Sequence, residues 1–263
     1  MRTVIRLLAL AVPAVLLSGC ITIGDARKPI TGIFVAAPQP EAERTLVVVL
    51  PGFGNAAEDM RQQGIAEAVH RHWPEADVLL TNATFAYYKE RNIVERLQAD
   101  VIAPARAQGY RQVWLAGASI GGMGVLFYEY AHPGAADGLV LLAPWAGDRK
   151  LIDEIAAAGG IAQWQPGEVP AAIDADNYQR EMWRVVKRWS EDEQRRQQVW
   201  LICGDHDRLL QTSRLIAPAL PDSHYIEIPG AHDWKTFLAA TERVIGAIRG
   251  RRAIAQAAAD RGY

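Results

Sequence analysis

Short hydrophobic runs alternate along the chain with longer amphipathic segments. Residues 45–50 form an uninterrupted run of β-branched residues and leucine that ends at Pro-Gly, a pattern typical of a strand buried on both faces of a parallel sheet. Strands alternating with helices predict βαβ crossovers, and therefore a single α/β domain with a mostly parallel central sheet and helices on both faces. The remaining predicted strands are residues 32–36, 76–80, 112–116, 138–142, 199–203 and 224–228. The predicted helices are residues 56–71, 93–108, 120–131, 213–219 and 233–251.

The alternation is interrupted between residues 146 and 197, a stretch much longer than the roughly two to six residues of a simple strand-to-helix connection. Residues 177–189 have a helical pattern, and Ser190 with Glu193 matches a capping box for a second short helix. We therefore predict a helical insertion. It is expected either to cover one edge of the sheet or to form a lid over a pocket, and the pattern leaves both open.

The first nineteen residues have the layout of a leader. Arg2 and Arg6 precede an apolar stretch over residues 7–17, which is too short for the ~20 apolar residues of a membrane-spanning helix. Residues 17–20, Leu-Ser-Gly-Cys, resemble the lipobox of bacterial lipoproteins, which implies cleavage before Cys20 and lipidation of that cysteine. The alternative is an ordinary secretory peptide. Ile21, where an aspartate would favour inner-membrane retention, points to the periplasmic side of the outer membrane within the bacterial cell envelope.

These features divide the chain into a signal peptide (1–19), a tether (20–31) within a stretch, residues 21–40, that is rich in Gly, Pro and Ala, a domain (32–251) and an Ala-rich tail (252–263). The 263 residues are 50% hydrophobic and 22% charged, with a net charge of −2 that becomes −4 without the leader. This balance argues against a nucleic-acid partner, which usually requires a basic surface. Cys20 and Cys203 lie in such different contexts that no disulfide is expected, and protein partners are not specified by the sequence.

A glycine-rich segment directly follows the predicted strand 112–116. Residues 117–121 read Gly-Ala-Ser-Ile-Gly, and in a strand-to-helix turn this G-x-S-x-G pattern indicates a nucleophile elbow that exposes Ser119. The turn places the backbone N–H of Ile120 at a helix N-terminus, where an oxyanion finds a free donor. Taken alone, the pattern also fits a glycine-rich turn of an unrelated fold.

Three other loops that follow predicted strands carry candidate chemistry. Residues 50–54, Leu-Pro-Gly-Phe-Gly, offer the backbone N–H of Phe53 as a second oxyanion donor. Residues 203–207, Cys-Gly-Asp-His-Asp, supply acids, and residues 229–234 contain His232. Serine, acid and histidine thus follow one another at the carboxyl ends of strands, where a doubly wound sheet places its active site.

These motifs, in this order, resemble those of the α/β-hydrolase superfamily from about residue 32 to residue 249. The resemblance implies that Ser119 is the nucleophile, His232 the general base and Asp207 the acid that orients the histidine. Asp205 and, after the preceding strand, Asp148 are the competing acids. The chain departs from many members at Pro51, where they have a histidine outside the triad, and this affects loop geometry more than chemistry.

The resemblance implies a serine hydrolase that cleaves a small-molecule ester or thioester through an acyl-enzyme. A peptidase or amidase of the same superfamily, and a lipid-anchored binding or scaffold protein without the chemistry, are the alternatives. The histidine spacings do not suggest a metal site, and no phosphate-binding or dinucleotide-binding glycine motif is present, so no cofactor is expected. Aromatic residues in loops after strands are candidates for a pocket wall, namely Phe53, Phe85, Tyr87, Tyr88 and Trp145.

Overall fold

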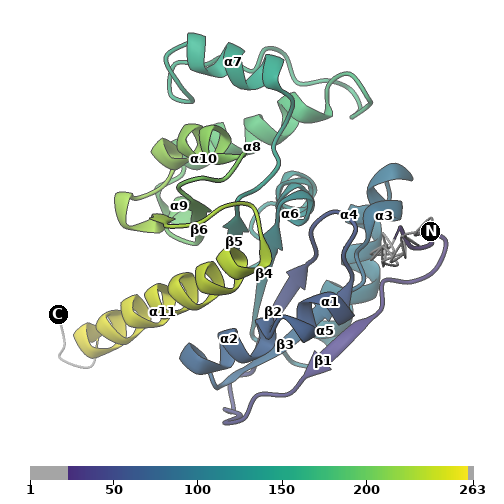
Figure 1. Ribbon diagram of the computed structural model, residues 1–263, viewed down its shortest axis with the longest axis vertical. Helices are drawn as coiled ribbons and strands as arrows, with labels where there is room; N and C mark the ends of the chain where they lie inside the picture. The colour runs from purple at the N-terminus through teal and green to yellow at the C-terminus, as the bar shows by residue number, and fades with distance from the viewer. Residues whose placement is uncertain (1–22, 260–263) are drawn as a thin grey trace, which may run out of the picture.

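Seven strands form one mixed sheet in the computed structural model, which describes residues 23–259 (Figure 1). Their order across the sheet is β1-β3-β2-β4-β5-β6-β7; β1 pairs antiparallel with β3 and all other pairs are parallel. The predicted mostly parallel sheet is therefore confirmed. The strands are β1 (Gly32–Val35), β2 (Thr45–Leu50), β3 (Ala76–Thr81), β4 (Gln112–Ala118), β5 (Gly138–Leu142), β6 (Val199–Gly204) and β7 (Tyr225–Ile228).

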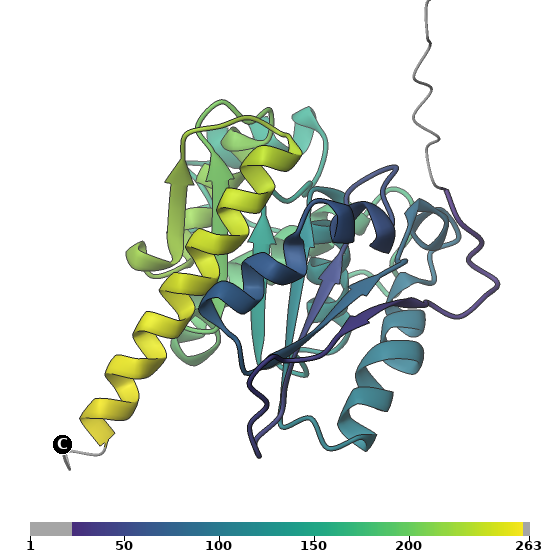
Figure 2. The ribbon, with the colours of Figure 1, turned by 60° about the horizontal axis from the view of Figure 1, so that its bottom comes forward.

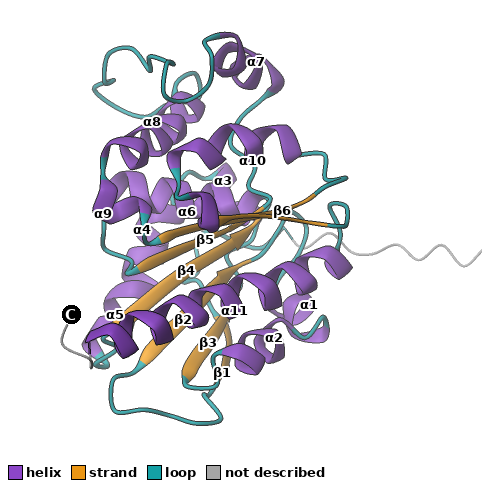
Figure 3. Ribbon diagram, turned by 90° about the vertical axis from the view of Figure 1, so that its left-hand side faces the viewer, coloured by secondary structure: helices purple, strands orange, loops and turns teal. Residues whose placement is uncertain are grey.

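Helices cover both faces of the sheet, as Figure 3 shows with the strands nearly edge-on. The face that carries the helix after the elbow holds most of them. They are α3 (Phe85–Lys89), α4 (Ile93–Leu97), the π-helical turn η1 (Gln98–Ile102), α5 (Ala103–Ala107), α6 (Ile120–Ala131), α7 (Arg149–Ala157), α8 (Tyr178–Glu191), α9 (Glu193–Arg196) and α10 (Leu210–Ile216). The opposite face holds α1 (Ala57–Gln62), α2 (Ile65–His72) and α11 (Trp234–Ala259). Two 3₁₀ turns, η2 (Ala217–Ala219) and η3 (Asp222–His224), lead into β7.

Two hydrophobic layers explain why β2 is apolar from Leu46 to Leu50. Leu46, Val48 and Leu50 belong to the core beneath α6, whereas Val47 and Val49 belong to the core beneath α11. Successive side chains of a strand point to opposite faces, so a strand covered on both sides requires a continuous apolar run.

Several elements differ from the sequence-based expectation. The predicted helix 56–71 is interrupted at Gly64, whose φ of 77° breaks it into α1 and α2. Helices α3 and α7 were not predicted, and α11 continues to Ala259, into the expected tail. The capping-box prediction was wrong, because Ser190 lies inside α8 and the carboxylate of Asp192 caps α9 by accepting from the Arg195 N–H at 2.9 Å.

The expected insertion, residues 146–197, is helical and contains α7, α8 and α9. The indole N–H of Trp183 donates to the Ala146 carbonyl at 2.6 Å, which fixes α8 to the chain that leaves β5. Trp164, Trp183 and Trp189 are fully buried, so the insertion is anchored by aromatic side chains.

The described part of the expected tether packs against α3 and α4 (Figure 2). The Ile23 carbonyl accepts from the Ala86 N–H at 2.9 Å, and the Asn92 side chain donates to the Ala26 carbonyl at 3.0 Å. Ala26 and Ile30 are buried in the core. The signal peptide and Cys20 lie outside the described residues.

Candidate active site

Ser119 lies in the turn between β4 and α6 with a strained backbone. Its φ of 55° and ψ of −116° are unusual for any residue other than glycine. The turn is held on both sides, since the Ser119 N–H donates to the Leu142 carbonyl at 3.0 Å and the Ser119 carbonyl accepts from the Trp145 N–H at 2.9 Å. Strain of this kind persists only where the surrounding structure fixes it.

The outer glycines of the elbow allow this turn to pack closely. A Cβ on Gly117 would lie 2.3 Å from the backbone of Gly121, and one on Gly121 would lie 2.5 Å from the Leu50 carbonyl oxygen. Both distances are below any normal contact, so a side chain at either position would push the elbow away from its neighbours. The structure therefore gives a steric reason for the G-x-S-x-G pattern.

The loops after β6 and β7 are joined by backbone hydrogen bonds. The Asp205 N–H donates to the Ile228 carbonyl at 2.8 Å, and the His206 N–H donates to the Gly230 carbonyl at 2.9 Å. These bonds bring the loop that carries the acids next to the loop that carries His232. The Ala231 N–H donates in turn to the Thr236 hydroxyl at 3.0 Å, which anchors the second loop to the start of α11.

His232 and Asp207 form a buried pair. The imidazole Nδ1 lies 2.9 and 2.8 Å from the two carboxylate oxygens of Asp207, whose side chain is almost fully buried. The Leu209 N–H donates to the same carboxylate at 2.7 Å and fixes its position. The ring of Phe237 packs edge-on against the imidazole, with centroids 5.0 Å apart. An acceptor at Nδ1 keeps the proton on that nitrogen and leaves Nε2 available as a base.

The two competing acids have other partners. Asp205 accepts from the Gly230 N–H at 3.0 Å and from Nδ1 of His206 at 2.6 Å, and these contacts hold the pKa of Asp205 below its usual range. Asp148 caps α7 by accepting from the Leu151 N–H at 3.1 Å. Of the three acids, Asp207 is the one whose carboxylate is hydrogen-bonded to His232.

Ser119 and His232 line the same cavity of about 230 Å³, together with Phe53. Residues 52–55 bend at the end of β2, where the Asn55 N–H donates to the Gly52 carbonyl at 3.2 Å, and this bend places Phe53 beside Ser119. Ile120 is the first residue of α6, so its N–H has no partner within the helix. The cavity is also lined by Gly52, Asn55, Arg208, Asp233, Trp234 and Phe237.

Three of these lining residues lie outside the motifs identified from the sequence: Asn55, Arg208 and Phe237. Asn55 directly follows the 50–54 loop and Arg208 directly follows Asp207, so their positions beside these motifs were an available signal. Phe237 lies one turn into α11, and a residue there faces the histidine loop only because of how that helix packs.

The predicted aromatic wall is divided between two places. Phe53 lines the catalytic cavity, whereas Phe85 and Tyr88 line a second, separate cavity. Tyr87 instead donates its hydroxyl to the carbonyls of Lys28 and Pro29, at 3.2 and 3.3 Å. The indole of Trp145 stacks on Tyr178, with ring centroids 6.4 Å apart.

Within residues 23–259, no three side chains of His, Cys, Asp or Glu are grouped as a metal site would require. None of the helices in that range has the length and apolar character needed to cross a membrane. Cys203 is buried behind the acid loop, and burial raises the pKa of its thiol to about 11.

Comparison with known proteins shows the fold. No family model matches the sequence, and no curated protein matches it. Among solved structures, the chain is similar to Est1E from Butyrivibrio proteoclasticus, with a TM-score of 0.56 at 18% identity over 85% of this chain and 95% of that one. It is also similar to S-formylglutathione hydrolase from Staphylococcus aureus, with a TM-score of 0.54 at 14% identity over 86% and 100% of the two chains. A third is FphF, a fluorophosphonate-binding serine hydrolase of Staphylococcus aureus, with a TM-score of 0.52 at 15% identity over 84% and 99%. The chain has the α/β-hydrolase fold.

Proposed function

We propose that this protein is a serine hydrolase that cleaves carboxylic esters or thioesters through an acyl-enzyme. The observation that carries the proposal is the Asp207–His232 pair, which opens onto the same cavity as Ser119 on its strained turn. The similar structures include an S-formylglutathione hydrolase and a fluorophosphonate-binding serine hydrolase, which agrees with this class of reaction.

The proposed mechanism assigns one role to each group. Nε2 of His232 takes the proton of Ser119 Oγ as that oxygen attacks the acyl carbon, while Asp207 stabilises the imidazolium. The backbone N–H groups of Phe53 and Ile120 stabilise the oxyanion that develops on the acyl oxygen. His232 then protonates the departing alcohol or thiol. Water, deprotonated by the same histidine, hydrolyses the acyl-serine and restores the free enzyme.

Labelling with a fluorophosphonate tests the reaction class. Wild-type protein should be labelled and Ser119→Ala should not, because the probe reacts with an activated serine. Unlabelled wild-type protein of normal folded stability would favour the non-catalytic binding or scaffold alternative. Nitrophenyl esters, acyl thioesters and peptide amides then separate an esterase or thioesterase from a peptidase or amidase.

We further propose that Cys20 carries a lipid anchor that holds the protein in the bacterial envelope, on the periplasmic side of the outer membrane. The support is the sequence of residues 17–20 and the identity of Ile21. Metabolic labelling with palmitate should mark wild-type protein but not Cys20→Ala, and fractionation should place wild-type protein in the outer membrane. Equal labelling of both proteins would remove the anchor from the proposal.

A further inference from the structure

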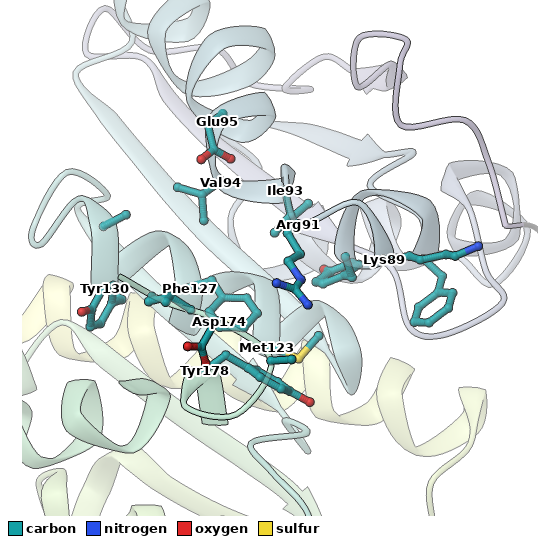
Figure 4. Close-up of a pocket in the computed structure, with 15 residues that line it drawn as sticks. Lys89, Arg91, Ile93, Val94, Glu95, Met123, Phe127, Tyr130, Asp174 and Tyr178 are labelled. Carbon is teal, nitrogen blue, oxygen red and sulfur yellow. The ribbon is translucent and has the colours of Figure 1, made fainter. Parts of the chain in front are cut away.

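A second cavity of about 490 Å³, more than twice the volume of the catalytic one, lies beside α6 (Figure 4). This size is typical of small-molecule sites in proteins. Ser119 does not line it, and its walls come from α3, α4, α6 and the insertion. The apolar side chains of the wall include Phe85, Ile93, Val94, Met123, Phe127 and Tyr178.

The cavity begins one helical turn beyond the elbow. Met123 follows Ser119 by four residues and so lies on the same side of α6, and Phe127 extends that side by another turn. From Met123 to Tyr130 the helix covers about 10 Å. On the side of the insertion, the cavity wall includes the ring of Tyr178, whose centroid lies 6.0 Å from that of the Phe127 ring.

Polar groups of the lining do not form a preorganised binding site for a polar ligand. Tyr88 turns its buried hydroxyl against Gly124, and within the described residues that hydroxyl has no hydrogen-bond partner. Lys89, Glu95 and Asp174 are exposed, and Lys89 points away from the cavity in Figure 4. The carboxylate of Asp174 already accepts from the backbone N–H groups of Asp176 and Asn177, at 2.9 and 3.0 Å. Arg91 reaches across from the turn after α3, but it is exposed and has no ion-pair partner among residues 23–259, so its flexible stem is free to move aside.

One aromatic pair separates the two cavities. Phe53 lines the catalytic cavity and Phe85 lines the second, and their rings meet edge-to-face with centroids 4.9 Å apart. Phe53 is 53% exposed, so little besides this contact holds its side chain. The linings of the two cavities therefore meet at this aromatic contact.

We propose that the second cavity binds the linear acyl chain of an amphiphilic ester and that the side chain of Phe53 is the gate between this chain and Ser119. The inference rests on the proposed hydrolase function and adds the class of substrate. The acyl carbon lies at Ser119, the chain passes Phe53 and Phe85, and its apolar end lies along α6. Phe53 thereby acts twice, with its backbone N–H toward the oxyanion and its ring as a determinant of chain length.

A matched pair of surface substitutions tests the cavity. Ile173 lines it and is 40% exposed, whereas Val169, in the same insertion and 67% exposed, lines neither cavity. The kcat/KM for nitrophenyl dodecanoate, divided by that for nitrophenyl butyrate, should fall about tenfold in Ile173→Asp, the effect of leaving roughly two methylene groups unburied. Val169→Asp should leave the ratio unchanged. Equal ratios in the two variants would overturn the assignment.

Filling the cavity gives a second measurement. Val94→Trp should lower the same ratio, and labelling by a small fluorophosphonate reports whether this variant folds. Phe53→Ala keeps the backbone donor and removes the ring, so the ratio should rise several-fold. If Phe53→Ala changed kcat/KM for both esters by the same factor, the role of Phe53 as a gate would be excluded.

Binding without turnover separates this inference from the proposed function. Dodecanoate should bind Ser119→Ala with one-to-one stoichiometry by calorimetry, and Val94→Trp in that background should abolish the binding. Protein that binds dodecanoate but is never labelled by a fluorophosphonate would contradict the hydrolase function and keep the apolar-chain site. Protein that is labelled, shows no chain-length effect and binds no dodecanoate would contradict the inference alone.

Discussion

Both carboxylate oxygens of Asp207 lie within 2.9 Å of Nδ1 of His232, so Asp207 holds the imidazole whichever oxygen accepts the hydrogen bond. Replacing Asp207 by Asn offers an amide N–H to the same nitrogen and favours the wrong tautomer. We expect Asp207→Asn to lower kcat about 10³- to 10⁴-fold on nitrophenyl butyrate, the scale of such changes in other triads. Steady-state kinetics at neutral pH measures the effect.

Asp205→Asn is the matched control for the acid. Asp205 accepts from the Gly230 N–H, and the amide oxygen of an Asn accepts equally well. The substitution should therefore change kcat by less than about fivefold, since the geometry of the histidine loop is kept. A larger loss in Asp205→Asn than in Asp207→Asn would reassign the acid.

Backbone strain at Ser119 predicts an unusual order of stability. Glycine adopts a positive φ without the steric cost that Ala and Ser incur, and strained residues of this kind cost of order 1–3 kcal/mol. Ser119→Gly should therefore unfold at a higher temperature than Ser119→Ala, although both lack the nucleophile. Thermal denaturation of the two variants measures the difference, and a less stable Gly variant would argue against strain in the elbow.

His224 predicts a loss of stability in mild acid. Its ring stacks on Trp200 with centroids 3.8 Å apart, its Nδ1 donates to the Val199 carbonyl at 2.9 Å, and Arg251 donates to its Nε2. Burial lowers the pKa of His224 to about 4, whereas the unfolded chain has the ordinary value near 6.5.

The unfolded state therefore binds more protons than the folded state between about pH 4 and 6.5, so stability falls as the pH drops through that window. The full contribution of this pKa difference to the free energy of unfolding is roughly 3 kcal/mol. Urea denaturation at pH 7.5 and pH 5 should show a smaller pH-dependent loss in His224→Gln than in wild type. The same loss in both proteins would assign the acid sensitivity to other groups.

Arg208 predicts a preference for substrates with an anionic leaving group. It lines the catalytic cavity, is exposed, and has no ion-pair partner within residues 23–259. Two substrates, 4-(butyryloxy)benzoate and methyl 4-(butyryloxy)benzoate, differ in the negative charge of the leaving group. Arg208→Gln should lower the ratio of kcat/KM for the charged substrate to kcat/KM for the neutral one about threefold to fivefold, and added salt should reduce this effect. Lys235→Gln removes the same charge from an exposed side chain outside the cavity and should leave the ratio unchanged.

The sequence predicted every strand of the sheet. The signal was clearest at β2, which is covered on both faces and is apolar from Leu46 to Leu50. The sequence also identified the loops that carry Ser119, Asp207, His232 and Phe53, because glycines and strand ends are local signals. The catalytic roles of Ser119, Asp207 and His232, like the oxyanion roles of Phe53 and Ile120, stay predictions.

Long-range packing explains what the sequence could not supply. Helix α3 has five residues and too little periodicity to be recognised, and yet three of its side chains line the larger cavity. The contact between Phe53 and Phe85 joins segments 32 positions apart, and no local pattern encodes it. Asp192 caps α9 in place of Ser190 because α8 continues two residues further than its pattern suggested.

The hydrogen bond from Ala86 to the Ile23 carbonyl has a consequence for how substrate would arrive. Cys20 precedes Ile23 by three residues, which span at most about 11 Å when extended. A lipid on Cys20 would thus be connected by a short segment to the part of the domain beside Phe85, which lines the larger cavity. This short connection would keep the larger cavity close to the membrane surface. An amphiphile in the membrane would then reach the cavity by diffusing in two dimensions along that surface.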